Sequence, residues 1–271
     1  MPFGPHRRHR ARAGPRRRAH RVSHRSTTAI RTPTAIRQPT AARPLATAIR
    51  EDTPMPALVV FDCYKTLITA PPVPGPEEFT THLSAALAVD AHLARKVVDS
   101  VYGAVFTAMT DPAALQPATL ALLDEALREQ GEPRPRAALE EALWQAFGCA
   151  DPAGFALCGP VADAMRRVAA AGHTVRLLSN CYLPGSLMRR LLRRTGVPDV
   201  YERALFSGDG GPKKPDPRAF RLIGEGAFDR RAMVGDDEEI DIAPAAALGW
   251  DTVRVDTDAL DPVGLPALAR R

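Results

Sequence analysis

The chain of 271 residues lacks a long apolar run, and no segment approaches the roughly 18 consecutive apolar residues that a membrane-spanning helix needs. Its hydrophobic content of 45% is nevertheless enough for a full core and an accessory domain. We therefore expect a soluble protein that has no membrane partner.

Cysteine is scarce and unclustered. The four cysteines show no Cys-x-x-Cys spacing and no accompanying histidine cluster. This pattern argues against a zinc site and against a disulfide framework, and it fits a reducing, cytoplasmic location best. Cys63 and Cys181 each follow a residue of interest by one position, and we expect both to be small buried fillers rather than nucleophiles.

Acidic residues are almost absent from residues 1–54, and lysine is entirely absent. This segment holds 13 Arg against Glu51 and Asp52, a net charge of +11, so the remainder carries −6. It cannot bury enough apolar surface to fold, and we expect a disordered basic tail. The favoured interpretation is that translation starts at Met55, directly before the first predicted strand. An unspecific solvated tail, weak nucleic-acid or anionic-surface binding and a targeting peptide are the alternatives.

Four polar motifs follow apolar segments in the rest of the chain. The apolar run 57–61, typical of a fully buried parallel strand, leads directly into Asp62. The other motifs are Leu-Leu-Ser-Asn at 177–180, Lys-Lys-Pro-Asp-Pro at 213–217 and Val-Gly-Asp-Asp-Glu-Glu-Ile-Asp at 234–241. An open α/β sheet holds its chemistry at the carboxyl ends of its strands, so we expect the motifs to converge there.

Two periodicities divide the chain. After a proline-rich connector at 71–76, apolar residues recur every three or four positions to residue 148, with breaks that predict about four helices. Beyond residue 158, predicted helices (161–171, 183–195, 217–224, 240–248) alternate with predicted strands (174–178, 204–207, 232–234, 252–255). This alternation predicts an α/β fold with a doubly wound parallel sheet. We place the core at 55–75 and 156–271, and a small all-α cap domain, inserted after the first strand, at 76–155.

In order, spacing and composition, the four motifs resemble those of the haloacid dehalogenase superfamily, whose members are mostly phosphatases with some dehalogenases. The resemblance covers residues 57–256, and the helical insert matches the position and character of that family's C1-type cap. It implies a Rossmann-like core and a hydrolase that works through a covalent intermediate on an aspartate.

The resemblance also implies a role for individual residues. Asp62 would be the nucleophile. Lys214, directly before Pro215, would pair with it and with the charge that develops on the transferred group, and Lys213 is the competing assignment. Three further residues would hold phosphoryl or carboxylate oxygens or orient the substrate: Thr66, Ser179 and Asn180.

The acidic motif at 234–241 predicts a metal site. So many like charges at one sheet edge are unfavourable unless a divalent cation neutralises them, and hard oxygen ligands at this density suit Mg²⁺. By the family pattern Asp236 would contact the metal and Asp241 would support it. The full predicted ligand set is Asp62, the main-chain carbonyl of Tyr64, Asp236, Asp237 and Asp241.

Tyr64 is the third candidate catalytic residue, after Asp62 and Lys214, but it departs from the phosphatase pattern. Phosphatases of this superfamily usually carry a second Asp there as general acid, which is worth roughly 10²–10⁴ in rate. A phenol with a pKa of about 10 is a poor substitute at neutral pH. A tyrosine at this position is typical of the metal-free two-haloacid dehalogenases. An enzyme of that subgroup would also need a cap arginine, such as Arg95, to hold the substrate anion. Against that subgroup stand the acidic motif and Phe220, where the dehalogenases tend to have a tyrosine.

The leading hypothesis is a Mg²⁺-dependent phosphatase that acts on a small phosphorylated metabolite through an aspartyl intermediate at Asp62. Two alternatives remain open. One is metal-free dehalogenation of a two-haloacid with Arg95 as anion binder. The other is a binding or regulatory protein that turns over poorly because Tyr64 lacks acid function.

Overall fold

The computed structural model describes residues 56–69, 71–151 and 153–256, so the predicted tail at 1–54 lies outside the described residues. A single parallel sheet forms the centre of the core. Its strands lie in the order β3-β2-β1-β4-β5. They are β1 (Leu58–Phe61), β2 (Thr174–Ser179), β3 (Arg203–Phe206), β4 (Arg231–Gly235) and β5 (Asp251–Arg254). The strand order changes direction beside β1, and ligands bind at such switch points in open α/β sheets.

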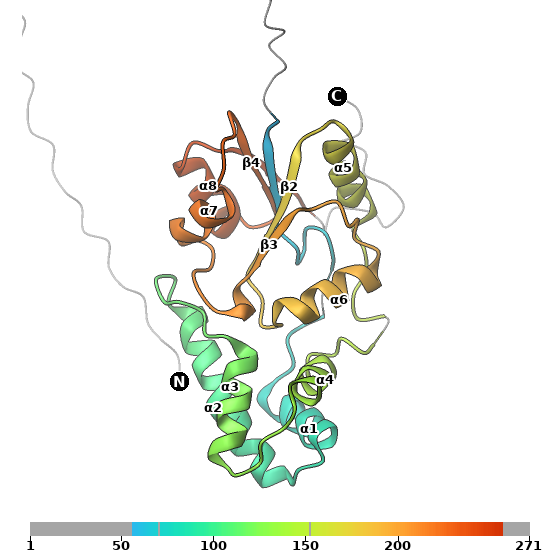
Figure 1. Ribbon diagram of the computed structural model, residues 1–271, viewed down its shortest axis with the longest axis vertical. Coiled ribbons are helices and arrows are strands. Elements are labelled where there is room, and N and C mark those ends of the chain that lie inside the picture. Colours follow the sequence, from blue (N-terminus) through green and yellow to red (C-terminus); the bar gives the residue numbers. More distant parts are fainter. Residues whose placement is uncertain (1–55, 70, 152, 257–271) are drawn as a thin grey trace, which may run out of the picture. The chain divides into compact units, whose positions relative to one another are not determined.

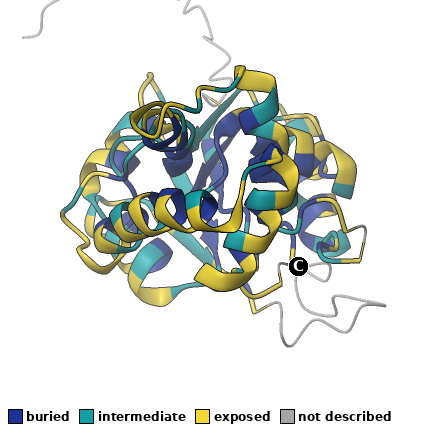
Figure 2. Ribbon diagram, turned by 90° about the horizontal axis from the view of Figure 1, so that it is seen from below, coloured by how far each residue is buried: buried dark blue, intermediate teal, exposed yellow. Residues whose placement is uncertain are grey.

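Helices cover both faces of this sheet (Figure 1). On one face lie α5 (Gly159–Ala170) and α6 (Gly185–Thr195), and on the other α7 (Pro217–Ile223) and α8 (Ala243–Ala247). Val60 packs with the α7 and α8 side, whereas the next residue, Phe61, packs in the cluster that contains α5 and α6. Because both faces of β1 are buried, its sequence is continuously apolar rather than alternating. In Figure 2 buried strands lie behind helices whose outer faces are exposed.

Four helices lie between β1 and α5, as the apolar spacing predicts. They are α1 (Pro76–Leu87), α2 (Ala91–Thr110), α3 (Thr119–Glu129) and α4 (Arg136–Ala146), and together with their connections we call them the cap. Phe79, Leu83 and Leu87 form the buried stripe of α1. The Asp90 side chain caps the N-terminus of α2 by accepting hydrogen bonds from two main-chain N–H groups. The α/β fold with a helical insert after the first strand is therefore confirmed, while the boundaries of the cap stay a prediction.

Contacts at several places fasten the cap to the core. At its two chain connections, Thr69 N donates to Ala156 O and Cys158 N donates to Leu67 O, both at 2.8 Å. Beyond α2, Lys213 Nζ of the core donates to the carbonyl oxygens of residues 111 and 114 at 2.8 and 2.7 Å. These contacts hold the cap against the core loop that carries the Lys-Lys-Pro motif.

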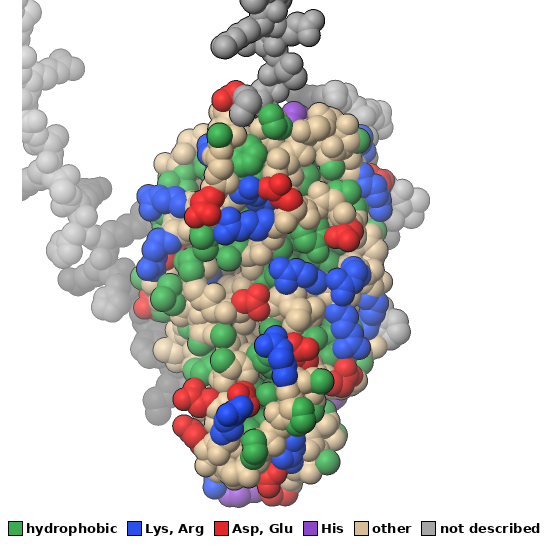
Figure 3. All heavy atoms as spheres, in the orientation of Figure 1, with side chains coloured by type: hydrophobic (Ala, Val, Ile, Leu, Met, Phe, Trp, Pro, Cys, Tyr) green, Lys and Arg blue, Asp and Glu red, His purple; other side chains and the backbone are tan. Residues whose placement is uncertain are grey.

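Another attachment joins α4 to α6. Arg190 of α6 lies over the Trp144 ring at 3.9 Å and pairs with Glu141 at 2.9 Å. Figure 3 shows the basic side chains of α6 gathered beside this junction. A cation over an indole ring contributes about 0.5–2 kcal/mol, depending on how far it is desolvated.

The longest described helix is α2 with 20 residues. In the described part of the chain, no helix is long and apolar enough to cross a membrane.

Candidate active site

Asp62 follows β1 directly and stays beside β4, because its main-chain N–H donates to Val234 O at 2.9 Å. Its side chain is almost fully buried, and Oδ1 lies 2.6 Å from Nζ of Lys214. The same ammonium group lies 2.5 Å from Oδ1 of Asp241. One buried cation thus bridges two buried carboxylates that come from distant parts of the sequence.

Burial raises the pKa of Asp62 to about 6, and the Asp241 carboxylate adds to this rise while Lys214 opposes it. For Lys214, burial alone would favour the neutral amine. The two carboxylates outweigh burial, and the pKa of Lys214 lies above its usual range. Lys214 therefore stays protonated as the counter-charge of the site.

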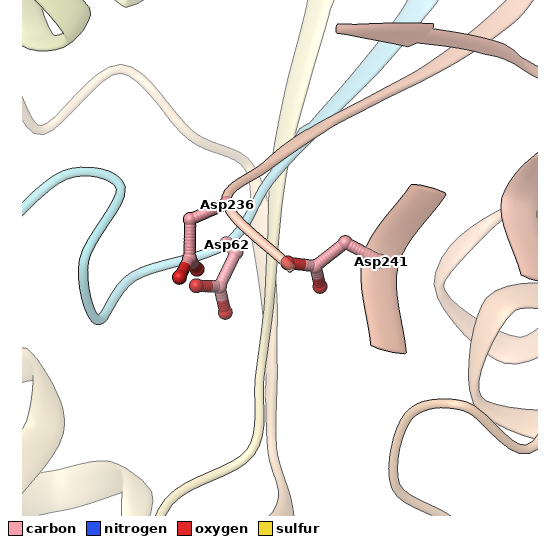
Figure 4. A group of neighbouring side chains, drawn as sticks. All are labelled: Asp62, Asp236 and Asp241. Atoms are coloured by element: carbon pink, nitrogen blue, oxygen red, sulfur yellow. The ribbon is translucent and has the colours of Figure 1, made fainter. Parts of the chain in front are cut away.

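A third carboxylate completes the cluster. Asp62, Asp236 and Asp241 each offer an oxygen, and these oxygens all lie within 4.8 Å of one another. Figure 4 shows the three side chains converging from β1, from the end of β4 and from the segment after it. Partial burial and the neighbouring Asp241 raise the pKa of Asp236, against the opposing charges of Lys65 and Lys214. The three carboxylates offer hard oxygen ligands of the kind that Mg²⁺ prefers.

The backbone after β4 is shaped to bring Asp241 into this cluster. Residues Glu238–Ile242 form a π-helical turn, where the sequence predicts a regular helix from 240 to 248. Pro244 supplies no main-chain N–H, and π turns are frequent at functional sites. A Cβ atom at Gly235 would overlap the Asp241 carboxylate, so only glycine fits there.

Asp237, a predicted metal ligand, lies outside the carboxylate cluster. Its Oδ1 accepts hydrogen bonds from the main-chain N–H groups of Glu239 and Ile240, both at 2.9 Å. In this position it caps the π-helical turn, and its main-chain N–H donates to Asp241 Oδ2 at 3.2 Å. Asp237 thus orients Asp241 rather than joining it at the cluster.

The two adjacent lysines have different partners. Lys214 enters the site, and its main chain is held by both ends of the Asn180 amide, with hydrogen bonds of 2.7 and 2.9 Å. Asn180 therefore positions the loop that carries Lys214. Lys213 instead donates to main-chain carbonyls of the cap. Its importance for the cap was not evident from the sequence, where it stands only as a competitor of Lys214.

Two predicted substrate-binding hydroxyls are buried with few or no polar partners. Among the described residues, Thr66 Oγ1 makes no hydrogen bond, and Ser179 Oγ has only the weakly polar thiol of Cys63 beside it. The Ser179 hydroxyl faces the thiol of Cys63, and burial, followed by the Asp62 charge, raises the pKa of that thiol well above its usual value. Cys63 is a buried, protonated filler. A buried hydroxyl without a partner costs about 1–3 kcal/mol, a cost that an incoming anionic ligand would remove.

Tyr64 points away from the carboxylates. Its hydroxyl donates to Sδ of Met188 on α6 at 3.1 Å, and burial raises its pKa well above the ordinary value. The next residue, Lys65, has a φ of 57°, in the left-handed region that a glycine adopts more readily. The side chain of Tyr64 is therefore not placed to protonate a group at Asp62.

Arg95 is not brought to the site. It lies in the first half of α2, pairs with Asp99 at 2.7 Å and is about half exposed. The end of α2 near the core carries Met109, which is about 21 Å further along the helix axis. The structure thus brings Asp62, Asp236, Asp241 and Lys214 together and leaves Arg95 outside.

The sequence model of the haloacid dehalogenase-like hydrolase family matches residues 56–249, which are more than two thirds of the chain. The chain belongs to this family. The match includes all four motifs and the whole cap, so this haloacid dehalogenase-like hydrolase carries the carboxylate cluster within its family-specific region.

One curated protein and two solved structures illustrate what this chain is similar to. A ribulose-1,5-bisphosphate 5-phosphatase of Halopiger xanaduensis is 33% identical over 130 residues, which are 46% of this chain and 52% of that protein. The matched stretch thus spans about half of that relative. A haloacid dehalogenase-type phosphatase of Thermococcus onnurineus shares 17% identity at a TM-score of 0.45, over 78% of this chain and 91% of that one. A 2-haloacid dehalogenase of Pseudomonas syringae shares 22% identity at a TM-score of 0.44, over 78% and 90% of the two chains.

Proposed function

We propose that this protein is a Mg²⁺-dependent phosphatase that hydrolyses a small phosphorylated metabolite through an aspartyl intermediate at Asp62. The observation that carries the proposal is the buried cluster of Asp62, Asp236 and Asp241, with Lys214 between two of its members. A metal-free dehalogenase has no use for three carboxylates that repel one another.

The residues present fit a magnesium ion. Asp62, Asp236 and Asp241 would hold it, together with the main-chain carbonyl of Tyr64 that the family pattern adds. When bound, Mg²⁺ supplies positive charge that offsets the phosphoryl oxygens and the clustered carboxylates. Without such a cation, three carboxylates would face a single ammonium group inside the protein.

The chain's own residues supply the nucleophile, its orientation and the groups that bind the phosphoryl oxygens. The Asp62 carboxylate attacks phosphorus, and the bond from phosphorus to the leaving oxygen breaks; water then releases phosphate from the aspartyl intermediate. Lys214 holds Asp62 in one orientation and remains charged beside it. Thr66 and Ser179 offer the buried hydroxyls that a phosphoryl group could engage. The cap limits the access of water to this edge of the sheet.

The first experiment incubates the full chain with a panel of small phosphomonoesters, with Mg²⁺ or with EDTA, and with L-2-chloropropionate in parallel. Phosphate release that EDTA abolishes and Asp62→Asn lowers at least 10³-fold supports the proposal. Chloride release that is indifferent to EDTA would instead identify a dehalogenase. Turnover of neither class of substrate would favour a binding protein, and either of these last two results contradicts the proposal.

A second readout does not depend on turnover. If the cluster binds Mg²⁺, millimolar Mg²⁺ should raise the Tm of the full chain, because a ligand of the folded state stabilises it. Asp236→Asn should cancel this rise, whereas the exposed Asp163→Asn should leave it intact.

A further inference from the structure

An open cavity of about 440 Å³ is lined by two residues that are close to the carboxylate site in the chain or in its hydrogen bonds. Tyr64 stands two residues after Asp62, and the Asn180 amide holds the main chain of Lys214. The prolines of the first cap connection and aromatic rings of the cap and core make up most of its lining: Pro72, Val73, Pro74, Phe147, Phe155 and Tyr182.

The hydroxyl and thiol groups of this lining are directed elsewhere. The Tyr64 hydroxyl donates to Met188 Sδ and the Tyr182 hydroxyl to Met109 Sδ. The Cys181 thiol donates to the Leu183 carbonyl at 3.3 Å. No carboxyl group and no histidine occurs among the described residues that line the cavity. Lys65 is the one remaining ionisable side chain of the described lining, and a lysine ammonium is a weak acid, so a departing oxygen meets no carboxylic acid or imidazole in this cavity.

At the carboxylate site the acidic side chains have other proposed roles, Asp62 as nucleophile and Asp236 and Asp241 as metal ligands. Both hydrogen bonds of the Lys214 ammonium go to carboxylates, and its positive charge offsets their negative charges. An alkyl phosphate would have to expel a strongly basic alkoxide, whereas a phenol ester expels a phenoxide, which is stable enough to leave as the anion.

We propose that the natural substrate is the phosphate ester of a phenol, whose ring occupies the cavity lined by Phe147, Phe155 and Tyr182 and whose phenoxide leaves without a proton from the enzyme. This inference rests on the proposed phosphatase function. A sugar bisphosphate fits less well, because a second phosphate calls for basic side chains, and Lys65 is the one charged residue among the described lining residues.

The bond changes balance without any further reactant. An oxygen of Asp62 forms a bond to phosphorus while the bond from phosphorus to the aryl oxygen breaks, and the phenoxide leaves with the electron pair and takes its proton from solvent. Water then attacks the aspartyl phosphate, restoring the carboxylate and releasing inorganic phosphate. In this second step the leaving group is itself a carboxylate, which is weakly basic and needs less acid assistance.

The test compares phenyl phosphate with benzyl phosphate on the full chain in Mg²⁺. The two esters carry the same ring, but benzyl phosphate expels an alkoxide. The value of kcat/KM reports events up to the formation of the intermediate. We expect phenyl phosphate to exceed benzyl phosphate at least 100-fold, and equal values would overturn the inference.

Variants of Tyr64 and Lys65 test whether the enzyme protonates the leaving oxygen. Tyr64→Asp should raise kcat/KM for benzyl phosphate at least tenfold more than for phenyl phosphate and so compress their ratio. Tyr64→Phe and Lys65→Gln should leave the ratio within about twofold of its original value, whatever they do to both rates. A selective loss with benzyl phosphate in either variant would reveal a proton donor and contradict the inference.

The aromatic pocket is tested separately from the leaving group. Val73 lines the cavity and is 46% exposed, so Val73→Asp should fold normally while placing a charge beside the ring. We expect KM for phenyl phosphate to rise about tenfold and that for acetyl phosphate, which has a good leaving group but no ring, to change less than twofold. Equal changes would contradict the placement of the ring. Phosphate release from acetyl phosphate alone would support the proposed function and overturn the aromatic substrate, whereas no release from acetyl phosphate or from any ester would overturn both.

Discussion

Within the described residues, the cap and the core bury different kinds of side chain. The buried stripes of the cap helices are almost entirely apolar, and all the buried charged side chains lie in the core: Asp62, Arg176, Lys213, Lys214 and Asp241. The cap is therefore held by the hydrophobic effect, which the spacing of its leucines and valines already reveals. The core instead retains a cluster of charges whose mutual repulsion works against folding, as expected of residues kept for chemistry rather than for stability.

The largest effect should follow from breaking the charge balance of the core. Lys214→Met leaves Asp62 and Asp241 buried without their shared cation. Removal of one partner of a buried ion pair costs about 3–5 kcal/mol. We expect a loss of this size in the free energy of unfolding, measured with urea in EDTA at neutral pH, together with loss of activity.

The same variant should recover part of this stability as the pH falls toward about 5, because the pKa of Asp62 is raised to about 6 by burial and its protonation removes the repulsion from Asp241. Lys213→Met is the matched control. Its partners are main-chain carbonyls, so any loss of stability should be independent of pH over that range. If Lys214→Met lost the same stability at both pH values, the loss would come from altered side-chain packing rather than from the missing charge.

In the cap, the corresponding test removes buried side-chain volume rather than charge. Leu143 of α4 is fully buried, and Leu143→Ala should lower the free energy of unfolding by about 2–5 kcal/mol. We expect this loss to be the same at neutral and mildly acidic pH and with or without Mg²⁺. Leu115→Ala is the control, since Leu115 is 54% exposed and its removal should cost less than about 0.5 kcal/mol. A clear dependence on pH would show that the cap also relies on charge.

The smallest effect should be a gain. Burial raises the pKa of Asp62 to about 6 from an ordinary value of 3.8, so the folded state binds this proton more tightly than the unfolded state. Stability from this group therefore rises as pH falls through about 6, and at neutral pH the ionised carboxylate is destabilising. Asp62→Asn should add about 1–3 kcal/mol at pH 7.5 in EDTA while abolishing turnover.

This gain should shrink as the pH approaches about 5, where the wild-type Asp62 becomes neutral. Thermal unfolding at several pH values measures it. The exposed Asp163→Asn serves as a control that should not alter the stability profile. A loss of stability in Asp62→Asn at neutral pH would mean that its pairing with Lys214 outweighs its burial.

Much of the architecture could be predicted because it depends on local pattern. The strand at β1 was evident from its apolar run, since both faces are buried, and the motifs converge because the carboxyl ends of parallel strands share one edge. The choice of Lys214 over Lys213 followed from its place before Pro215, and the structure puts Lys214 beside Asp62.

Other features depend on side-chain direction and on contacts between distant segments, which no local pattern encodes. Tyr64 could be placed near the site by position, but the turn of its hydroxyl toward Met188 depends on the packing of α6. Asp237 stands beside Asp236 in sequence, yet the π-helical turn gives it the role of a cap. The contact of Lys213 with Asp111 joins residues 102 positions apart.

The hydrogen bonds that join the two chain connections of the cap have a consequence for how such proteins diversify. Thr69 N and Ala156 O are only 2.8 Å apart, so the two ends of the insertion leave the core side by side. This geometry does not depend on how many residues lie between them. The entropy of closing a loop grows only with the logarithm of its length, about 0.6 kcal/mol for each doubling. The core can therefore accept a longer, shorter or unrelated insertion at this point with little change in its own stability, so a new recognition surface can be acquired by exchanging one segment while the catalytic scaffold is inherited unchanged.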